Sequence, residues 1–76
     1  DTVIKSEIAE NIKSIIKEKG FLQKAIAERA GYSVKTFNAM LNHRKVIKDS
    51  DIIPIAKALN VEPNELFRVR TNNKTA

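Results

Sequence analysis

The chain has 76 residues, of which 42% are hydrophobic, so it can form one small domain with a modest core. It has no cysteine and a single histidine, which excludes disulfides and thiolate metal sites, and we expect neither a zinc site nor a cofactor. Its net charge is +5, and no hydrophobic run approaches the roughly 20 residues that span a bilayer, so we expect a cytoplasmic protein with no membrane partner.

The positive charge is concentrated in the middle of the chain. Residues 23–48 contain six basic residues and one acidic residue, which accounts for the whole net charge of +5. The remaining residues carry eight basic and eight acidic side chains. A local basic surface favours a polyanionic partner, which would be nucleic acid or, as the weaker alternative, an anionic membrane.

Hydrophobic residues recur with a period near 3.6, which predicts helices throughout. The first helix should run from about Thr2 or Ser6 to Lys19, with Gly20 as a left-handed C-cap. Its core-facing stripe would consist of isoleucines, namely Ile4, Ile8, Ile12, Ile15 and Ile16.

Two short helices should follow. The first of them runs from about Gln23 to Ala30 and stops at Gly31, and the next runs from about Val34 to Leu41 with Ser33 as its N-cap. The residues expected to face the core are Ile26, Ala27, Ala30, Phe37, Met40 and Leu41.

The rest of the chain predicts a loop and two further helices. Residues 42–50, "NHRKVIKDS", form a basic loop, and Ser50 or Asp51 should cap a fourth helix that tolerates Pro54 in its first turn and ends at Asn60. Its inward residues would be Ile52, Ile55, Ala56 and Leu59. Pro63 should start a short fifth helix that ends near Phe67.

Together these elements predict an all-α, compact five-helix bundle over residues 1–70, followed by a polar tail or the start of a linker over residues 71–76. Because residue 1 is aspartate and not methionine, we expect the chain to be trimmed or excised from a longer protein. A C-terminal regulatory or oligomerisation domain is one of the partners that we consider.

Residues 23–42, "QKAIAERAGYSVKTFNAMLN", have the logic of a helix-turn-helix. Ala27 is small where two helices would cross, and Gly31 can adopt a positive φ at the turn. Hydrophobic residues would lock the two helices together, namely Ile26, Ala30, Tyr32, Phe37 and Met40. The second helix of such a pair can be presented to a major groove.

At this point the sequence resembles the lambda-repressor-like, Cro/C1-type (XRE family) helix-turn-helix domain over roughly residues 6–67. The resemblance rests on Gln23, Ala27 and Gly31 at their spacing, on the hydrophobic positions of the turn, and on the closing run "IIPIAKALNVEPNELF". It implies sequence-specific binding of double-stranded DNA by a bacterial or phage transcriptional regulator. In that family the commoner role is repression, with a dimer on a palindromic operator and the third helix (about 33–41) in the major groove.

The resemblance also implies roles for individual residues. Four would face base edges, namely Ser33, Val34, Lys35 and Asn38, of which Lys35 would donate to guanine, Asn38 would pair with adenine N6 and N7, and Val34 would pack on a thymine methyl. Five would hold phosphates, namely Gln23, Thr36, Asn42, Arg44 and Lys45.

Three residues depart from the family pattern. Val34 stands where a polar, often glutamine-like base reader is usual, so the pair that such a side chain makes with Gln23 is missing. His43 stands where many relatives have glycine, and Leu22 replaces the usual serine or threonine cap before the second helix.

Other functions receive less support from the sequence. It contains no Ser–His–Asp set, paired-carboxylate pocket or phosphate-binding glycine loop, so we expect no enzyme. The same fold can serve as a protein-interaction module, such as an antitoxin or adaptor, and this alternative can coexist with DNA binding. A dimer contact could involve the last helix around Leu66, Phe67 and Val69, or a C-terminal domain.

Overall fold

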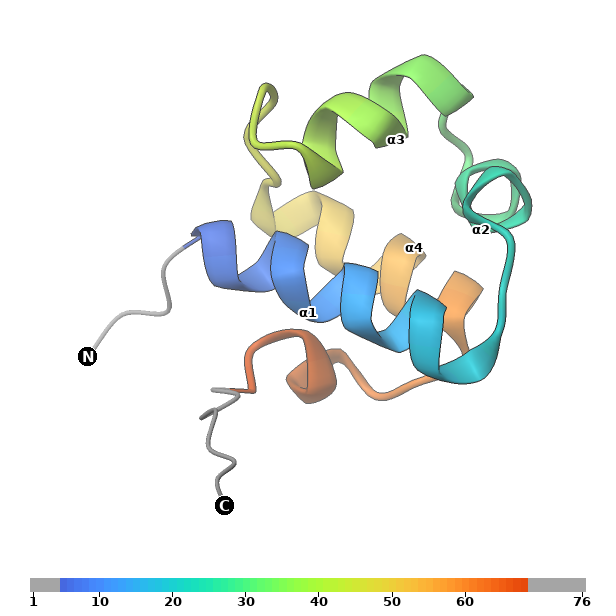
Figure 1. Ribbon diagram of the computed structural model, residues 1–76. Helices are drawn as coiled ribbons and strands as arrows, with labels where there is room; N and C mark the ends of the chain where they lie inside the picture. Colours follow the sequence, from blue (N-terminus) through green and yellow to red (C-terminus); the bar gives the residue numbers. More distant parts are fainter. Residues whose placement is uncertain (1–4, 69–76) are drawn as a thin grey trace.

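The computed structural model describes residues 5–68, which form four α helices and one short 3-10 helix, with no strand among the described residues (Figure 1). The elements are α1 (Lys5–Lys19), α2 (Gln23–Ala30), α3 (Val34–Leu41), α4 (Asp49–Leu59) and η1 (Pro63–Leu66). The predicted all-α class is confirmed. Ile4, Val69 and the predicted tail 71–76 lie outside the described residues.

The predicted fifth helix is a 3-10 turn, so the count of five α helices is wrong by one. The amide of Glu65 donates to the carbonyl of Glu62 at 2.9 Å, and the amide of Phe67 donates to the carbonyl of Asn64 at 3.1 Å. These bonds span three residues, and the element is four residues long, which is too short to propagate an α helix.

The helices pack so that α3 lies on one side of the molecule and η1 on the other, with α1 and α4 between them (Figure 1). Helix α4 contacts both α2 and η1, while α1 contacts both α3 and η1. The helix-turn-helix pair α2–α3 is therefore supported by the rest of the bundle along its inner face.

The core contains the hydrophobic residues that the helical period predicted. Phe37 and Ala27 are fully buried, and the absence of exposed area at Ala27 leaves no room for a larger side chain where α2 meets its neighbours. Ile16 and Ala30 are only partly buried. The remaining predicted core residues among the described ones are buried, namely Ile8, Ile12, Ile15, Ile26, Met40, Leu41, Ile52, Ile55, Ala56 and Leu59.

A left-handed residue follows each of the four α helices, and after α3 it comes one residue beyond the C-cap Asn42. The φ angles are 71° at Gly20, 90° at Gly31, 66° at His43 and 62° at Asn60, which confirms the predicted ends at Gly20 and Asn60. At the end of α3, the amide of Arg44 returns to the carbonyl of Ala39 at 2.8 Å. This arrangement satisfies carbonyls that the helix itself leaves without donors.

His43 takes the conformation that a glycine would take, at a cost of about 1–2 kcal/mol for a side chain with a Cβ. Its Nε2 lies 3.1 Å from Oε2 of Glu10 on α1, so the loop is attached to the first helix. Hydrogen bonds from Lys13 and then from His43 lower the pKa of the Glu10 carboxyl. Both side chains are largely exposed, so we assign this contact a modest part in stability.

Helix α4 begins earlier than the sequence predicted. Lys48 is the N-cap, and Asp51 is the third residue of the helix, where its Oδ2 accepts a hydrogen bond from the Lys48 amide at 2.8 Å. Pro54 therefore lies in the second turn instead of the first. The bond that proline cannot donate would have gone to the carbonyl of Ser50, an exposed residue within reach of water.

Asn11 is a buried polar residue that the sequence analysis did not identify. Only 2% of it is exposed, and its Nδ2 donates to the carbonyl oxygens of Leu66 at 2.8 Å and Arg68 at 2.7 Å. Leu66 is the last residue of η1 and Arg68 lies two residues beyond it, so one side chain on α1 holds the end of η1 and the residues after it against the bundle.

We predict that Asn11→Ala lowers the free energy of unfolding by about 2–3 kcal/mol, because the buried hydrogen bond to the Leu66 carbonyl and the partly buried one to the Arg68 carbonyl are both lost. Urea unfolding followed by circular dichroism measures this change. The exposed Asn64→Ala is the matched control and should stay within about 0.5 kcal/mol. Equal effects of the two substitutions would contradict a clamping role for Asn11.

Candidate DNA-binding surface

The turn between α2 and α3 fixes the relation of the two helices. Gly31, at φ 90°, donates to the carbonyl of Glu28 at 3.1 Å, and the amide of Tyr32 donates to the carbonyl of Ala27 at 2.9 Å. The sequence predicted a positive φ at Gly31, and the structure confirms it.

Tyr32 joins this turn to α4. Its ring stacks on Phe37, with 6.3 Å between ring centroids and an interplanar angle of 12°, and its hydroxyl donates to Oδ1 of Asp51 at 2.5 Å. Burial, the hydrogen bond to Asp51 and the negative charge of Asp51 raise the pKa of Tyr32 to about 12. The sequence analysis assigned Tyr32 to the core and missed its polar partner.

Ser33 caps α3 as predicted. Its Oγ accepts a hydrogen bond from the Thr36 amide at 3.1 Å, and its hydroxyl donates to Oγ1 of Thr36 at 3.0 Å. The Ser33 hydroxyl is therefore already engaged within the first turn of α3, whereas Thr36 keeps its own hydroxyl hydrogen available for another acceptor.

Helix α2 begins without a side-chain cap. Leu22 stands at the N-cap position, is 74% exposed and has no side-chain oxygen to accept a hydrogen bond. The first amides of α2, beginning with that of Gln23, point out of the helix with no acceptor from the cap. Unpaired amides at a helix N-terminus favour an anionic group such as a phosphate.

Three side-chain amides are linked across α2, α3 and the residue after α3. Nε2 of Gln23 lies 3.3 Å from Oδ1 of Asn38, and Nδ2 of Asn42 lies 3.0 Å from the same oxygen. The Asn42 amide also donates to the backbone carbonyl of Asn38 at 2.9 Å. Val34 has no polar group to offer to Gln23. Asn38, one turn further along α3, takes its place as the side-chain partner of Gln23.

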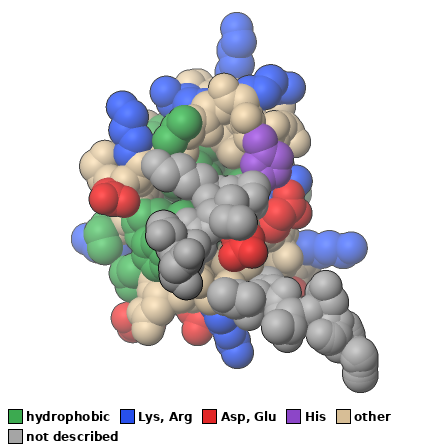
Figure 2. Space-filling model, turned by 90° about the vertical axis from the view of Figure 1, so that its left-hand side faces the viewer, with side chains coloured by type: hydrophobic (Ala, Val, Ile, Leu, Met, Phe, Trp, Pro, Cys, Tyr) green, Lys and Arg blue, Asp and Glu red, His purple; other side chains and the backbone are tan. Residues whose placement is uncertain are grey.

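The cationic side chains of this side are available to a ligand. Lys35, Arg44 and Lys45 are exposed, and within residues 5–68 none of them forms an ion pair. Lys and Arg side chains gather along the top of the view in Figure 2, which is the side of α3, while the Asp and Glu side chains of that face lie lower. Val34 adds a hydrophobic side chain that is 44% exposed.

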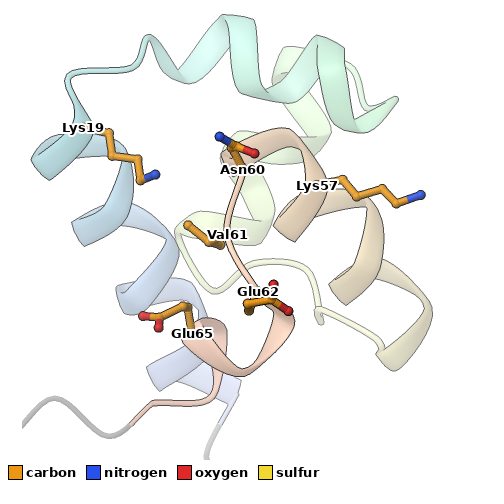
Figure 3. A pocket seen from close by; sticks show the side chains of 6 residues that line it. All are labelled: Lys19, Lys57, Asn60, Val61, Glu62 and Glu65. Carbon is orange, nitrogen blue, oxygen red and sulfur yellow. The ribbon is translucent and has the colours of Figure 1, made fainter.

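A second surface feature lies at the C-terminal ends of α1 and α4. An open groove of about 610 Å³ is lined by two lysines and two glutamates together with two uncharged residues, namely Lys19, Lys57, Glu62, Glu65, Asn60 and Val61 (Figure 3). It contains none of the nine residues that the sequence predicted to contact DNA. No group of three or more possible metal ligands occurs among the described residues, and none of the described helices is long and hydrophobic enough to cross a membrane.

Residues 11–72 match the model of the Cro/C1-type helix-turn-helix DNA-binding domain. The chain belongs to this family. Family membership makes it a DNA-binding domain of the type found in transcription regulation, as the sequence resemblance indicated, and the family is not one of enzymes. No curated protein sequence matches the chain significantly.

Among solved structures, this Cro/C1-type domain is similar to the restriction-modification controller protein C.AhdI from Aeromonas hydrophila. The TM-score is 0.74 at 23% sequence identity, and the match covers 80% of this chain and 92% of that chain. At this level of identity the likeness concerns the fold alone.

The geometry brings most of the predicted site residues of this Cro/C1-type domain onto α3, the start of α2 and the loop after α3. Gln23 and Asn42 each form a hydrogen bond with Asn38, and Ser33 forms one with Thr36. The side chains of Lys35, Arg44 and Lys45 form no hydrogen bond or ion pair with these residues within residues 5–68. Their assignment to bases or phosphates stays a prediction.

Tyr32 offers a direct test of the link between the turn and α4, because it is the chain's single tyrosine and there is no tryptophan. We predict that its absorbance titration near 295 nm has a midpoint of about 12. The folded state raises this pKa above the unfolded value of about 10. The neutral Tyr32 hydroxyl therefore makes its full contribution to the free energy of unfolding below pH 10, and this contribution is lost as the pH rises through about 12.

Asp51→Asn should lower this midpoint while leaving it above about 10, because the charge of Asp51 is removed and the burial of the ring remains. Asp49→Asn, which removes a charge from the same turn of α4 without touching Tyr32, is the control and should leave the titration unchanged. An unchanged midpoint in Asp51→Asn would contradict the contact.

Proposed function

We propose that this domain binds a palindromic operator as a dimer and represses transcription, with α3 of each copy in the major groove of one half-site. The observation that carries the proposal is the position of α3. Its inner face consists of the buried residues Phe37, Met40 and Leu41. Its outer face carries Lys35, and the loop after it carries Arg44 and Lys45, all three exposed and without an ion pair among the described residues. A B-DNA major groove about 12 Å wide admits an α helix presented in this way.

The proposed contacts divide into two groups. Val34, Lys35 and Asn38 face base edges, and Ser33 does so while keeping its cap bond to Thr36. Phosphate contacts come from the start of α2 and from the end of α3 with its loop, namely Gln23, Thr36, Asn42, Arg44 and Lys45. Base contacts specify the sequence, while phosphate contacts fix the register of the domain on the duplex.

Dimerisation supplies much of the affinity in this proposal. One copy of so small a domain presents one short recognition helix, whereas two linked copies bind two half-sites with an effective concentration that neither has alone. Two-fold symmetric half-sites one helical turn apart, about 34 Å, or a multiple of that distance, would match such a dimer.

A selection from a random duplex library, carried out at low and at near-physiological salt, tests the proposal. A palindromic consensus that survives the higher salt is the expected result. Binding without enrichment that collapses as salt rises would mean that the basic face is a polyanion patch, because charge neutralisation alone depends steeply on salt. Sedimentation of the complex on the selected duplex should give two copies of the chain per site.

Two substitutions separate base contacts from phosphate contacts. Lys35→Ala should cost about 1–3 kcal/mol of binding on the selected site and much less on random DNA, because it removes a base contact. Arg44→Ala, the matched control, should weaken binding to both DNAs alike and reduce the salt dependence. Equal losses on both DNAs for Lys35→Ala would reassign Lys35 to a phosphate.

A further inference from the structure

The amide network around Asn38 determines which atom of that side chain can contact DNA. Asparagine has one oxygen that accepts hydrogen bonds and one nitrogen that donates them, and the two can exchange places by a half turn of the amide. The neighbours of Asn38 fix the choice, beginning with Asn42.

The orientation of Asn42 follows from a backbone group. One atom of its amide lies 2.9 Å from the backbone carbonyl oxygen of Asn38. A carbonyl oxygen can only accept, so that atom is the donor Nδ2. The same nitrogen lies 3.0 Å from the side chain of Asn38, so the Asn38 atom facing it is the acceptor, Oδ1.

A second donor reaches the same oxygen from another helix. Nε2 of Gln23, the first residue of α2, lies 3.3 Å from Oδ1 of Asn38. An amide oxygen can accept two hydrogen bonds, and this one has two donors within hydrogen-bond distance. The Nδ2 hydrogens of Asn38 have no partner among the described residues, and Asn38 is partly exposed on the outer part of α3.

Major-groove base edges differ in what they offer to such a group. The familiar pairing of asparagine with adenine needs both functions, because Oδ1 must accept from N6 while Nδ2 donates to N7. Guanine offers two acceptors, N7 and O6, and cytosine offers only the N4 donor. A side chain whose oxygen is already occupied can only donate. It finds two acceptors on guanine and none on cytosine, so guanine is its best match and cytosine its worst.

We propose that Asn38 reads DNA as a donor only and selects guanine instead of adenine, with Gln23 and Asn42 as positioning residues that occupy its oxygen. This inference rests on the proposed function, and it names the base that one residue of that surface recognises. Gln23 keeps a second Nε2 hydrogen and its backbone amide for a phosphate, so the positioning role and the phosphate role are compatible.

The experiment measures base preference at one position. Binding of the wild type and of Asn38→Ala to the selected duplex, with all four base pairs placed in turn at each half-site position, identifies the base pair whose preference depends on Asn38. We expect guanine there, and replacing it by 7-deazaguanine, which lacks the N7 acceptor, should weaken wild-type binding roughly tenfold and Asn38→Ala binding much less.

The positioning residues are tested by the ratio of guanine to adenine affinity and not by overall affinity. Gln23→Ala combined with Asn42→Ala frees Oδ1 of Asn38, so this ratio should fall by roughly tenfold as adenine becomes able to pair. Arg44→Ala is the matched control: it also removes a phosphate contact but does not touch Asn38, so its ratio should equal that of the wild type.

The outcomes separate this inference from the proposed function. A clear consensus in which the Asn38-dependent base is adenine, or in which the double substitution leaves the ratio unchanged, overturns the donor-only role while operator binding stands. Selection without any consensus overturns both. A guanine preference that depends on Asn38 and is lost in the double variant supports the inference.

Discussion

The placement of α3 depends on the contacts that the carboxylate of Asp51 makes. One of its oxygens accepts the Tyr32 hydroxyl from the α2–α3 turn, and the other accepts the Lys48 amide at the start of α4. A single side chain thus completes the first turn of one helix and holds the turn between two others. Tyr32 also stacks on Phe37 of α3. The hydroxyl of Tyr32 thus binds α4 while its ring packs on α3, and together these two contacts fix the orientation of α3.

Short helices need such external support. Helices α2 and α3 have eight residues each, which is below the length at which an isolated helix is stable in water. They persist because their buried faces share one core and because their ends are closed by left-handed residues. His43 shows the cost of this arrangement, since the loop keeps the left-handed conformation without glycine and attaches it to α1 through Glu10.

The sequence was sufficient to predict the four α helices and most of the core, because both follow from local periodicity and from residues such as Gly31 and Asn60 with clear backbone preferences. It missed Ile47, which is buried although it lies in the loop that was predicted to be basic and exposed to a ligand. It did not predict what depends on distant partners. Asn11 gives no local sign that it will meet the carbonyl of Leu66, 55 residues away. The start of α4 was misplaced because Asp51 can cap a helix from its third residue as well as from its N-cap, and the sequence alone does not distinguish the two.

The same limit applies within the candidate site. Periodicity predicts that Asn38 lies on the outer face of α3, but the face says nothing about whether its oxygen or its nitrogen is available. That choice comes from Asn42, whose own orientation is set by a backbone carbonyl, and from Gln23 on another helix. With Val34 in the place of a polar reader, Gln23 has no partner at residue 34, and its bond goes to Asn38 instead. A substitution at one base-facing position can thereby change the hydrogen-bonding character, and so the base preference, of another.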